Sequence, residues 1–293
     1  MNHETGRNDN NTKPALFGSL HMRRLSGPAA SIVQSFKSHR MRAVGPIVFC
    51  IVILLAAAYW MYDGFSHPRQ YTYEKHISAS GIELHVLETA PDNVQLTTIE
   101  QNVTNTPFYG INGGFFWEGA LLSIAVVNDR PLKGEPGDYG SGWYNTGVNA
   151  DLKRGTLVWD ELTRRFTVQV ATDASELSVT DKQHYWAQGG VSMGLGDEYG
   201  WENHMISEEM PAYDEERMRS ALVFDRNQRL YMVVTPTPST VYDFRLAIME
   251  RLGGRGLVDG IFLDGDGSSQ LQCRARSLSG DGRPVYQMLA MKQ

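Results

Sequence analysis

The feature that most constrains this chain is a run of twenty residues without a charged side chain, "AVGPIVFCIVILLAAAYWMY", over 43–62. At the helical rise of about 1.5 Å per residue, such a run spans the roughly 30 Å hydrocarbon core of a bilayer. Arg40 and Arg42 precede it, and Tyr59 and Trp60 lie at its other end. Basic residues mark the cytoplasmic flank of a span, and aromatic rings suit the headgroup region. The sequence therefore predicts a transmembrane signal-anchor helix with a cytoplasmic N-terminus.

A cleaved signal peptide is the alternative interpretation of the same run, because Ala56, Ala57 and Ala58 offer small residues for a cleavage site. The polar stretch before the run exceeds the usual length of the basic region that opens a signal peptide. Both interpretations export the rest of the chain, and a single-pass membrane protein is favoured. We therefore expect an extracytoplasmic main domain, in the periplasm or at the cell surface.

Charge is distributed unevenly along the chain. Residues 1–62 carry a net charge of +5, so the remaining residues carry −11 of the total of −6. Nucleic-acid binding needs clustered Lys and Arg to neutralise phosphates, which excludes that class of partner for the acidic part. The two cysteines, Cys50 and Cys273, lie in different parts of the chain, which leaves no disulfide and no Cys-based zinc site for the main domain.

Composition and periodicity divide the chain into four parts. Residues 1–42 are polar and basic and predict a disordered cytoplasmic tail, 43–62 the membrane helix, 63–73 a linker, and 74–293 a single domain. The last part is rich in short alternating apolar segments separated by Gly, Asp, Asn or Pro. The fold class predicted is α+β, a mixed and sheet-rich single domain with a few helices. The strands expected cover 82–87, 94–99, 121–127, 166–171, 220–224 and 229–234.

One helix stands out within this domain. Its apolar residues recur at helical spacing over 241–252, with Ser239 as the expected N-cap and Gly253-Gly254 as the end. A strand over 257–263 follows. Two Gly-rich segments, 130–155 and 194–216, predict long loops, and long ordered loops often form walls or lids over a site.

Two motifs carry possible chemistry before that last strand. In "YGINGGFFWEG", Asn112 precedes two glycines that permit a close backbone approach to a ligand, although Asn-Gly is also the strongest hairpin-turn signal. In "ERMRSALVFD", Arg217 and Arg219 share one face of an extended segment. A guanidinium there can bind a phosphate or carboxylate, but an ordinary ion-paired arginine is the simpler interpretation.

The segment "FLDGDGSSQL" places Asp264 and Asp266 in one tight loop. Paired carboxylates serve acid and base chemistry, hold sugar hydroxyls or bind a cation. The calcium loop of an EF-hand is excluded, because its sixth position holds Ser269 instead of glycine and its twelfth holds Ala275 instead of glutamate. A divalent cation bound in another geometry is a disfavoured alternative, so no metal and no cofactor are predicted. No nucleophile-elbow motif surrounds Ser268.

The order of the motifs is more specific than any one of them. "NGGFF", "QGGVSM" over 188–193, "RSALVF" and "LDGDGSS" together resemble the phosphodiester glycosidase family, over about 75–293. The resemblance implies hydrolysis of a sugar-1-phosphodiester. This sequence departs from the family pattern at two positions, Asp266 and Val223, where the family usually has glycine. An extra carboxylate at Asp266 is expected either to change the charge preference of the site or to mark a relative whose activity is changed or lost.

The resemblance also implies roles for individual residues. Arg219 would stabilise the phosphate leaving group, and Asp264 would stabilise the sugar cation or activate water. The expected catalytic residues are Asp264, Arg219, Asn112 and Asp266, and the expected substrate-binding residues are Gly113, Gly114, Phe116, Gln188, Ser268 and Ser269.

The function expected is a membrane-anchored extracytoplasmic hydrolase that cleaves a sugar-1-phosphodiester bond in a cell-envelope glycan. Its partners are then a glycan or sugar-phosphodiester substrate and the membrane, through 43–62, with no nucleic acid. The alternative is a noncatalytic envelope glycan-binding module on the same fold.

Overall fold

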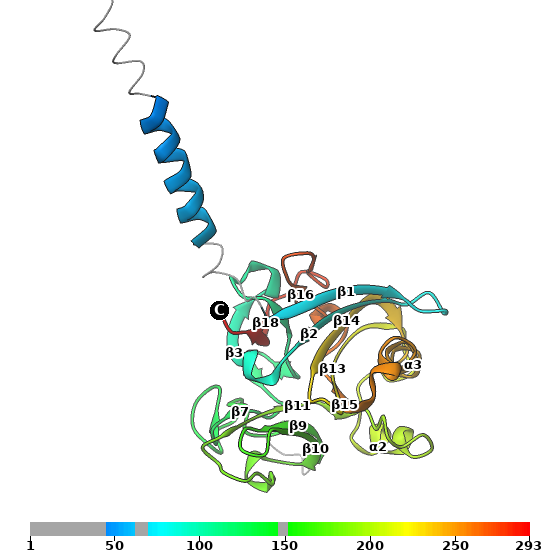
Figure 1. Cartoon of the computed structure of the whole chain (residues 1–293). Helices are drawn as coiled ribbons and strands as arrows, with labels where there is room; N and C mark the ends of the chain where they lie inside the picture. The colour runs from blue at the N-terminus through cyan, green and yellow to red at the C-terminus, as the bar shows by residue number, and fades with distance from the viewer. Residues whose placement is uncertain (1–44, 62–69, 146–151) are drawn as a thin grey trace, which may run out of the picture. The chain divides into compact units, whose positions relative to one another are not determined.

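The computed structural model describes residues 45–61, 70–145 and 152–293 (Figure 1). The chain divides into two compact units, Met1–Trp60 and Met61–Gln293. Residues 45–61 form an α-helix, of which 45–60 belong to the first unit. None of the helices among the described residues is both long and apolar enough to cross a membrane. The predicted tail over 1–42 lies outside the described residues, as do 63–69 of the predicted linker.

The second unit is built on a six-stranded sheet in the order β1-β2-β14-β13-β15-β12. Every strand pairing in it is antiparallel. Its strands are β1 (Tyr71–Ile77), β2 (Glu83–Thr89), β12 (Val191–Ser192), β13 (Arg217–Asp225), β14 (Leu230–Ser239) and β15 (Leu257–Phe262).

Two five-stranded antiparallel sheets and a small hairpin complete the unit. One sheet comprises β10 (Arg165–Ala171), β9 (Arg154–Asp160), β11 (Tyr185–Gly189), β7 (Ala125–Val127) and β8 (Arg130–Pro131). The other comprises β17 (Ser277–Leu278), β16 (Leu271–Gln272), β4 (Gly110–Asn112), β18 (Val285–Met291) and β3 (Val94–Gln101). The hairpin joins β5 (Phe116–Trp117) to β6 (Ala120–Leu121).

The described helices of this unit are short. They are α2 (Trp201–Ser207) and α3 (Val241–Leu252), with 3-10 turns η1 (Pro91–Asn93), η2 (Val103–Asn105), η3 (Ala174–Glu176), η4 (Gly253–Arg255) and η5 (Asp266–Ser268).

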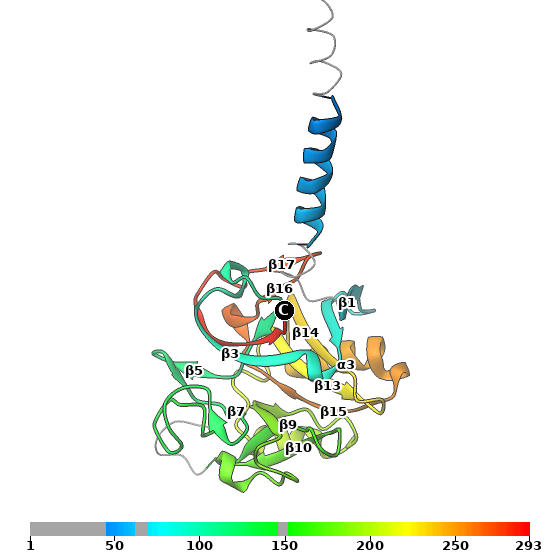
Figure 2. The same cartoon turned by 60° about the vertical axis from the view of Figure 1, so that its left-hand side comes forward.

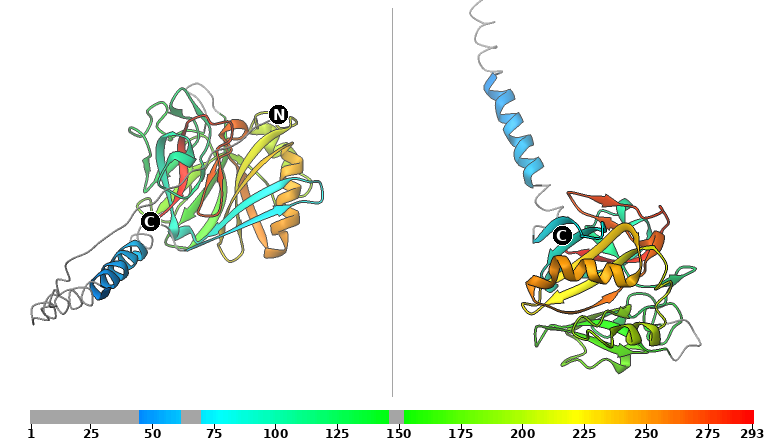
Figure 3. Two further views of the ribbon diagram at one scale, coloured as in Figure 1. Left: turned by 90° about the horizontal axis from the view of Figure 1, so that it is seen from above. Right: turned by 90° about the vertical axis from the view of Figure 1, so that its right-hand side faces the viewer.

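Strand β13 shows how the core is divided. Its alternate residues Ala221 and Val223 pack against α3, which covers that face of the sheet (Figure 3). Leu222 and Phe224 point to the opposite face and join a second core with residues of the two five-stranded sheets. Figure 2 shows β9 and β10 of one of these sheets beneath β13 and β15. The central strand β13 is therefore buried on both faces, whereas the edge strand β1 is partly exposed.

Val223, one of the two departures from the family pattern, has a simple steric account. Its cross-strand partner on β15 is Gly260. A Cβ atom added to Gly260 would lie 2.6 Å from a methyl carbon of Val223. Because Gly260 on β15 has no side chain, β13 can carry a valine at position 223.

The sheet-rich mixed fold predicted from the sequence is confirmed, with some corrections. The stretch 121–127 does not form one strand, because it is divided between β6 and β7. Strand β1 begins at Tyr71, so ordered structure starts before the predicted boundary at 74. The expected loop over 194–216 contains α2.

The helix predicted over 241–252 is α3, but its N-cap is wrong by one position. Ser239 is the last residue of β14, and the hydroxyl of Thr240 accepts a 3.1 Å hydrogen bond from the backbone N–H of Asp243. The helix is followed at Gly253 by η4, and the next residue, Gly256, adopts the left-handed conformation, with φ of +78°.

Candidate functional site

A pocket of about 300 Å³ lies where segments distant in sequence meet. Asp264, Asp266 and Arg219, all expected to be catalytic, are among the residues that line it. Part of its wall comes from the 194–216 segment, which was expected to form such a wall. The full lining is Phe115, Met210, Pro211, Ala212, Arg217, Arg219, Asp264, Gly265, Asp266 and Arg283.

Asp264 lies two residues beyond the buried end of β15, and it lines the pocket. Burial raises the pKa of its carboxyl to about 7, because desolvation penalises the charged form. The backbone N–H of Gly265, 3.1 Å from Oδ1, and the nearby Arg283 offset part of this rise. A carboxyl with this pKa exchanges its proton near neutral pH, which suits acid or base catalysis.

Asp266 begins η5 with φ of +52°, in the left-handed region that favours glycine. The backbone thus keeps the conformation of a glycine position while the side chain adds a carboxylate. Its Oδ2 lies 3.5 Å from Nη1 of Arg217 and 3.9 Å from Nη2 of Arg283. The side chain is 49% exposed, so these ion pairs are at the mouth of the pocket.

Arg219 is buried on β13, and most of the N–H groups of its guanidinium donate to main-chain carbonyls. Its Nε donates to the carbonyl of Ser239 at 3.1 Å, and its Nη2 to those of Ala212 and Glu215 at 2.5 and 2.6 Å. Among the residues that the structure describes, Nη1 makes a single contact of 3.5 Å, with the carbonyl of Pro211. Burial lowers the pKa of Arg219 to about 10. The guanidinium therefore shapes the wall at 211–215, and only Nη1 has spare capacity for an anion.

Two further arginines line the pocket and were not expected as site residues. Arg217 lines the pocket together with Arg219, although the pairing of β13 with β14 is irregular between the two residues. It is held by Glu215, 2.5 Å from its Nη2. Arg283 comes from the loop before β18 and is held by Asp281 at 2.5 Å. No sequence motif marks Arg283, whereas the spacing of Arg217 and Arg219 was a usable signal.

Asn112 is fully buried at the end of β4, and its side-chain amide forms hydrogen bonds within the protein. Its Nδ2 donates to the carbonyl of Asp264 at 2.8 Å, and its Oδ1 accepts from the hydroxyl of Ser220 at 2.8 Å. The backbone N–H of Gln270 donates to the same Oδ1 at 3.2 Å. Asn112 therefore positions the loop that carries Asp264 and does not line the pocket.

Gly113 and Gly114 are glycines because their neighbours leave no room. An added Cβ would lie 2.3 Å from Oε1 of Gln287 at Gly113, and 2.8 Å from Nε2 of Gln188 at Gly114. Gln188 itself is fully buried, bonded to Gln287 and to the carbonyl of Gly189. These residues form the packed layer behind the pocket, and they are absent from its lining.

The two adjacent phenylalanines face different environments. Phe115 lines the pocket, with the guanidinium carbon of Arg154 5.2 Å from its ring centre. Phe116, the residue expected to bind substrate, packs against Tyr286 at 5.1 Å between ring centres. Alternation along a short extended segment explains why only one of them can reach the site.

Ser268 and Ser269 are buried in and after η5. Within the described part of the chain, neither hydroxyl makes a hydrogen bond of ordinary geometry. Ser268 nevertheless lies close enough to the Asp264 carboxyl to counter part of the rise in its pKa. Among the described residues, no three His, Cys, Asp or Glu side chains gather in a way that could hold a metal ion.

Comparisons with known proteins bear on the fold. The sequence matches no protein-family model and no curated protein. The solved catalytic domain of zebrafish N-acetylglucosamine-1-phosphodiester alpha-N-acetylglucosaminidase, auto-inhibited by its pro-peptide, is similar at a TM-score of 0.54 and 12% identity. The similarity covers 76% of this chain and 82% of that domain. At this identity the likeness shows a shared fold.

Two further solved structures are similar at lower scores. A hypothetical protein from Synechocystis has a TM-score of 0.39 and 12% identity, over 75% of this chain and 62% of that one. A putative exported protein from Burkholderia pseudomallei has a TM-score of 0.31 and 11% identity, over 76% and 58%. Of these three structures, the zebrafish domain alone indicates a distant similarity of fold to a phosphodiester glycosidase catalytic domain.

Proposed function

We propose that this chain is a hydrolase that cleaves the bond between a sugar and a phosphodiester in a cell-envelope glycan. The observation that carries the proposal is the Asp264 carboxyl, with a pKa of about 7, in a pocket that it shares with three arginines. The similarity of the fold to the zebrafish glycosidase domain supports the same reaction class. Neither support depends on the other.

The reaction divides between the two kinds of side chain. Water attacks C1 of the sugar, the bond from C1 to the phosphate oxygen breaks, and the phosphate leaves with the bonding electrons as a monoester. Ionised Asp264 accepts the proton of the attacking water and stabilises the positive charge that develops on the sugar. A phosphate is a good leaving group without protonation, so the site needs cations at the leaving oxygen rather than a second acid.

The cations available for that oxygen are Arg217, Arg283 and the Nη1 of Arg219. Arg217 and Arg283 are exposed enough at the pocket mouth to meet a ligand, with 42% and 43% of their side-chain surface accessible. Guanidinium groups match the oxygens of a phosphate in a bidentate geometry. Asn112 and the two glycines after it act indirectly, because they fix the Asp264 loop.

Turnover of a panel of methyl diesters of sugar-1-phosphates tests this proposal. The full-length chain should release free sugar and methyl phosphate in equal amounts from at least one of them. Asp264→Asn should abolish release, while Asp92→Asn, an exposed carboxylate paired with Arg164, should not change it. No release from any diester, or full activity in Asp264→Asn, would contradict the proposal. Saturable binding without release would indicate the glycan-binding module instead.

We propose in addition that residues 43–62 anchor the chain in a membrane, with the acidic part outside the cytoplasm. The uncharged run and its flanking arginines and aromatic rings support this. Fractionation tests it: the full chain should stay with membranes in alkaline carbonate. A variant with Leu54→Arg and Leu55→Arg should be released, because charges at the centre of a span are costly. Release of the unaltered chain would contradict the anchor.

A further inference from the structure

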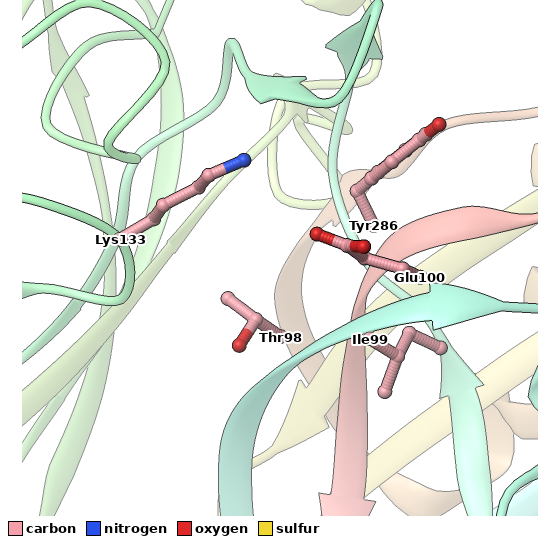
Figure 4. A pocket seen from close by; sticks show the side chains of 5 residues that line it. All are labelled: Thr98, Ile99, Glu100, Lys133 and Tyr286. Atoms are coloured by element: carbon pink, nitrogen blue, oxygen red, sulfur yellow. The ribbon is translucent and has the colours of Figure 1, made fainter.

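A second pocket, of about 310 Å³, opens at the pairing of β3 with β18. None of its lining residues belongs to the first pocket, which is lined by Asp264 and is called the Asp264 pocket below. It is lined by Thr98, Ile99, Glu100, Lys133 and Tyr286 (Figure 4).

An irregularity in the strand pairing creates this pocket. Val285 pairs with Gln101, and Gln287 pairs with Thr98, so Ile99 and Glu100 together stand opposite Tyr286. This two-against-one count is a β-bulge, which turns side chains away from the regular alternation. Ile99 packs into a core cluster, while Glu100 is left exposed at the pocket.

The tyrosine ring is held in place from behind. Phe116 packs on it at 5.1 Å between ring centres and an angle of 58°. The turn of the β5–β6 hairpin lies against it as well, since a Cβ added to Gly119 would be 3.4 Å from Cε1 of Tyr286. A half-buried ring fixed in this way offers an aromatic surface at little entropic cost on binding.

Three polar groups at this pocket can form further hydrogen bonds: the Lys133 ammonium, the Glu100 carboxylate and the hydroxyl of Tyr286 itself. Nζ of Lys133 donates to the carbonyl of Gly119 at 2.7 Å, which fixes its direction and leaves two donors free. In the described part of the chain, the Glu100 carboxylate and the Tyr286 hydroxyl have no hydrogen-bonding or ionic partner. Figure 4 shows Lys133 reaching in from one side and Glu100 and Tyr286 standing on the other.

A fixed aromatic ring, an unpaired carboxylate and a tethered ammonium match one class of ligand. The carbon-bound hydrogens of a pyranose ring can lie on the aromatic surface, its hydroxyls can donate to Glu100, and its oxygens can accept from Lys133 and Tyr286. A phosphate-bearing ligand fits less well, since Glu100 would repel it. We propose that this pocket is a glycan-binding subsite that takes one sugar unit. Phe115 lines the Asp264 pocket and Phe116 braces Tyr286, so neighbouring residues support both sites.

Saturation-transfer NMR tests this subsite without relying on turnover. The full-length chain, in a detergent without a sugar headgroup, is mixed with the methyl glycosides of glucose, galactose and N-acetylglucosamine at about 10 mM, since single-sugar sites bind in the millimolar range. We expect transfer to at least one glycoside. Glu100→Gln and Tyr286→Phe should each raise its Kd about tenfold, the effect of losing a hydrogen bond to a charged or fixed group.

The controls separate this subsite from the catalytic pocket. Asp264→Asn should leave the Kd within about twofold, because effects at separate sites are independent. The matched variants Glu198→Gln and Tyr199→Phe, at exposed positions outside both pockets, should behave like the unaltered chain. Absence of transfer to every glycoside, or an unchanged Kd in both Glu100→Gln and Tyr286→Phe, would overturn the subsite. A Kd raised by Asp264→Asn alone would place the sugar in the catalytic pocket and also overturn it.

Discussion

The side-chain amide of Asn112 donates a 2.8 Å hydrogen bond to the main-chain carbonyl of Asp264, which lies 152 positions further along the chain. Its oxygen accepts from the hydroxyl of Ser220 on β13 and from the backbone N–H of Gln270 after η5. One buried amide thus joins the segments "NGGFF", "RSALVF" and "LDGDGSSQ", which are distant in sequence.

We expect Asn112→Ala to destabilise the protein by about 3 kcal/mol, because it leaves several buried partners unsatisfied and opens a small cavity. Turnover should fall as well, since the loop that carries Asp264 loses its attachment. Urea denaturation measures the first effect, and kcat on the best sugar-1-phosphodiester measures the second.

Ser220→Ala is the matched control, because it removes only the bond to the Asn112 oxygen. Its cost should be about 1 kcal/mol, the usual value for one neutral hydrogen bond, with kcat little changed. Equal stabilities of Asn112→Ala and Ser220→Ala would show that the bond to Asp264 contributes nothing.

The sequence predicted strands from short apolar or alternating segments that are bounded by polar or turn residues. Residues 220–224 were identified by their apolar character and lie in β13, between two cores. Strand β9, "RGTLVWD", was missed: it begins inside the Gly-rich stretch 130–155 that was assigned to loops, and five of its seven residues are buried, so no alternation marks it. Such a segment reveals itself only through its neighbours in the sheet.

The same limit applies to the site. Asp264 was predicted because a motif surrounds it. Phe116 was predicted to bind substrate although Phe115 lines the pocket, because no local pattern shows which of the two rings faces the site. Arg283 reaches the site only because its loop folds back on η5, where a Cβ at Gly280 would lie 2.0 Å from the carbonyl of Gly267. That approach is a tertiary contact without a local pattern.

The pH dependence of turnover should report on Asp264. If its ionised form accepts a proton from water, kcat/KM should rise about tenfold per pH unit below the pKa of about 7 and level off above it. The initial rate of sugar release between pH 4 and pH 9, under saturating and limiting substrate, measures this. A rate that declines above pH 7 would instead assign Asp264 the role of a proton donor.

Asp264→Asn should make the protein more stable at alkaline pH while abolishing turnover. The folded-state pKa of about 7 lies above the unfolded value of 3.8, so the folded state binds more protons between those values. Stability then falls as pH rises from about 4 to about 7, by on the order of 4 kcal/mol, and stays low above that range. An uncharged amide avoids this penalty. Melting temperatures of both proteins at pH 5 and pH 8 check it, and a lower Tm of the variant at pH 8 would contradict it.

Arg219 and Arg217 should respond differently to lysine. Arg219→Lys removes a fork that binds several carbonyls, and we expect a loss of about 3 kcal/mol of stability together with most of the turnover. Arg217→Lys changes an exposed side chain, so its stability should change by less than about 0.5 kcal/mol while KM rises. Chemical denaturation and steady-state kinetics separate the two effects. An Arg219→Lys protein of full stability would contradict the wall-holding role.

Asp266 should set the charge preference of the pocket rather than take part in the chemistry. Its carboxylate lies 3.5 Å from Arg217 and 3.9 Å from Arg283, so it competes with a substrate phosphate for the same two cations. Asp266→Asn removes that competition and keeps a residue that tolerates the left-handed backbone. Binding of a sugar-1-phosphate should tighten about fivefold at low salt, the effect of roughly 1 kcal/mol of screened Coulomb energy. Titration calorimetry at two salt concentrations measures the effect, which should shrink as salt screens the arginines.

Asp266→Gly should bind equally tightly, since glycine also suits φ of +52°. Loss of turnover in both variants would make Asp266 a catalytic residue.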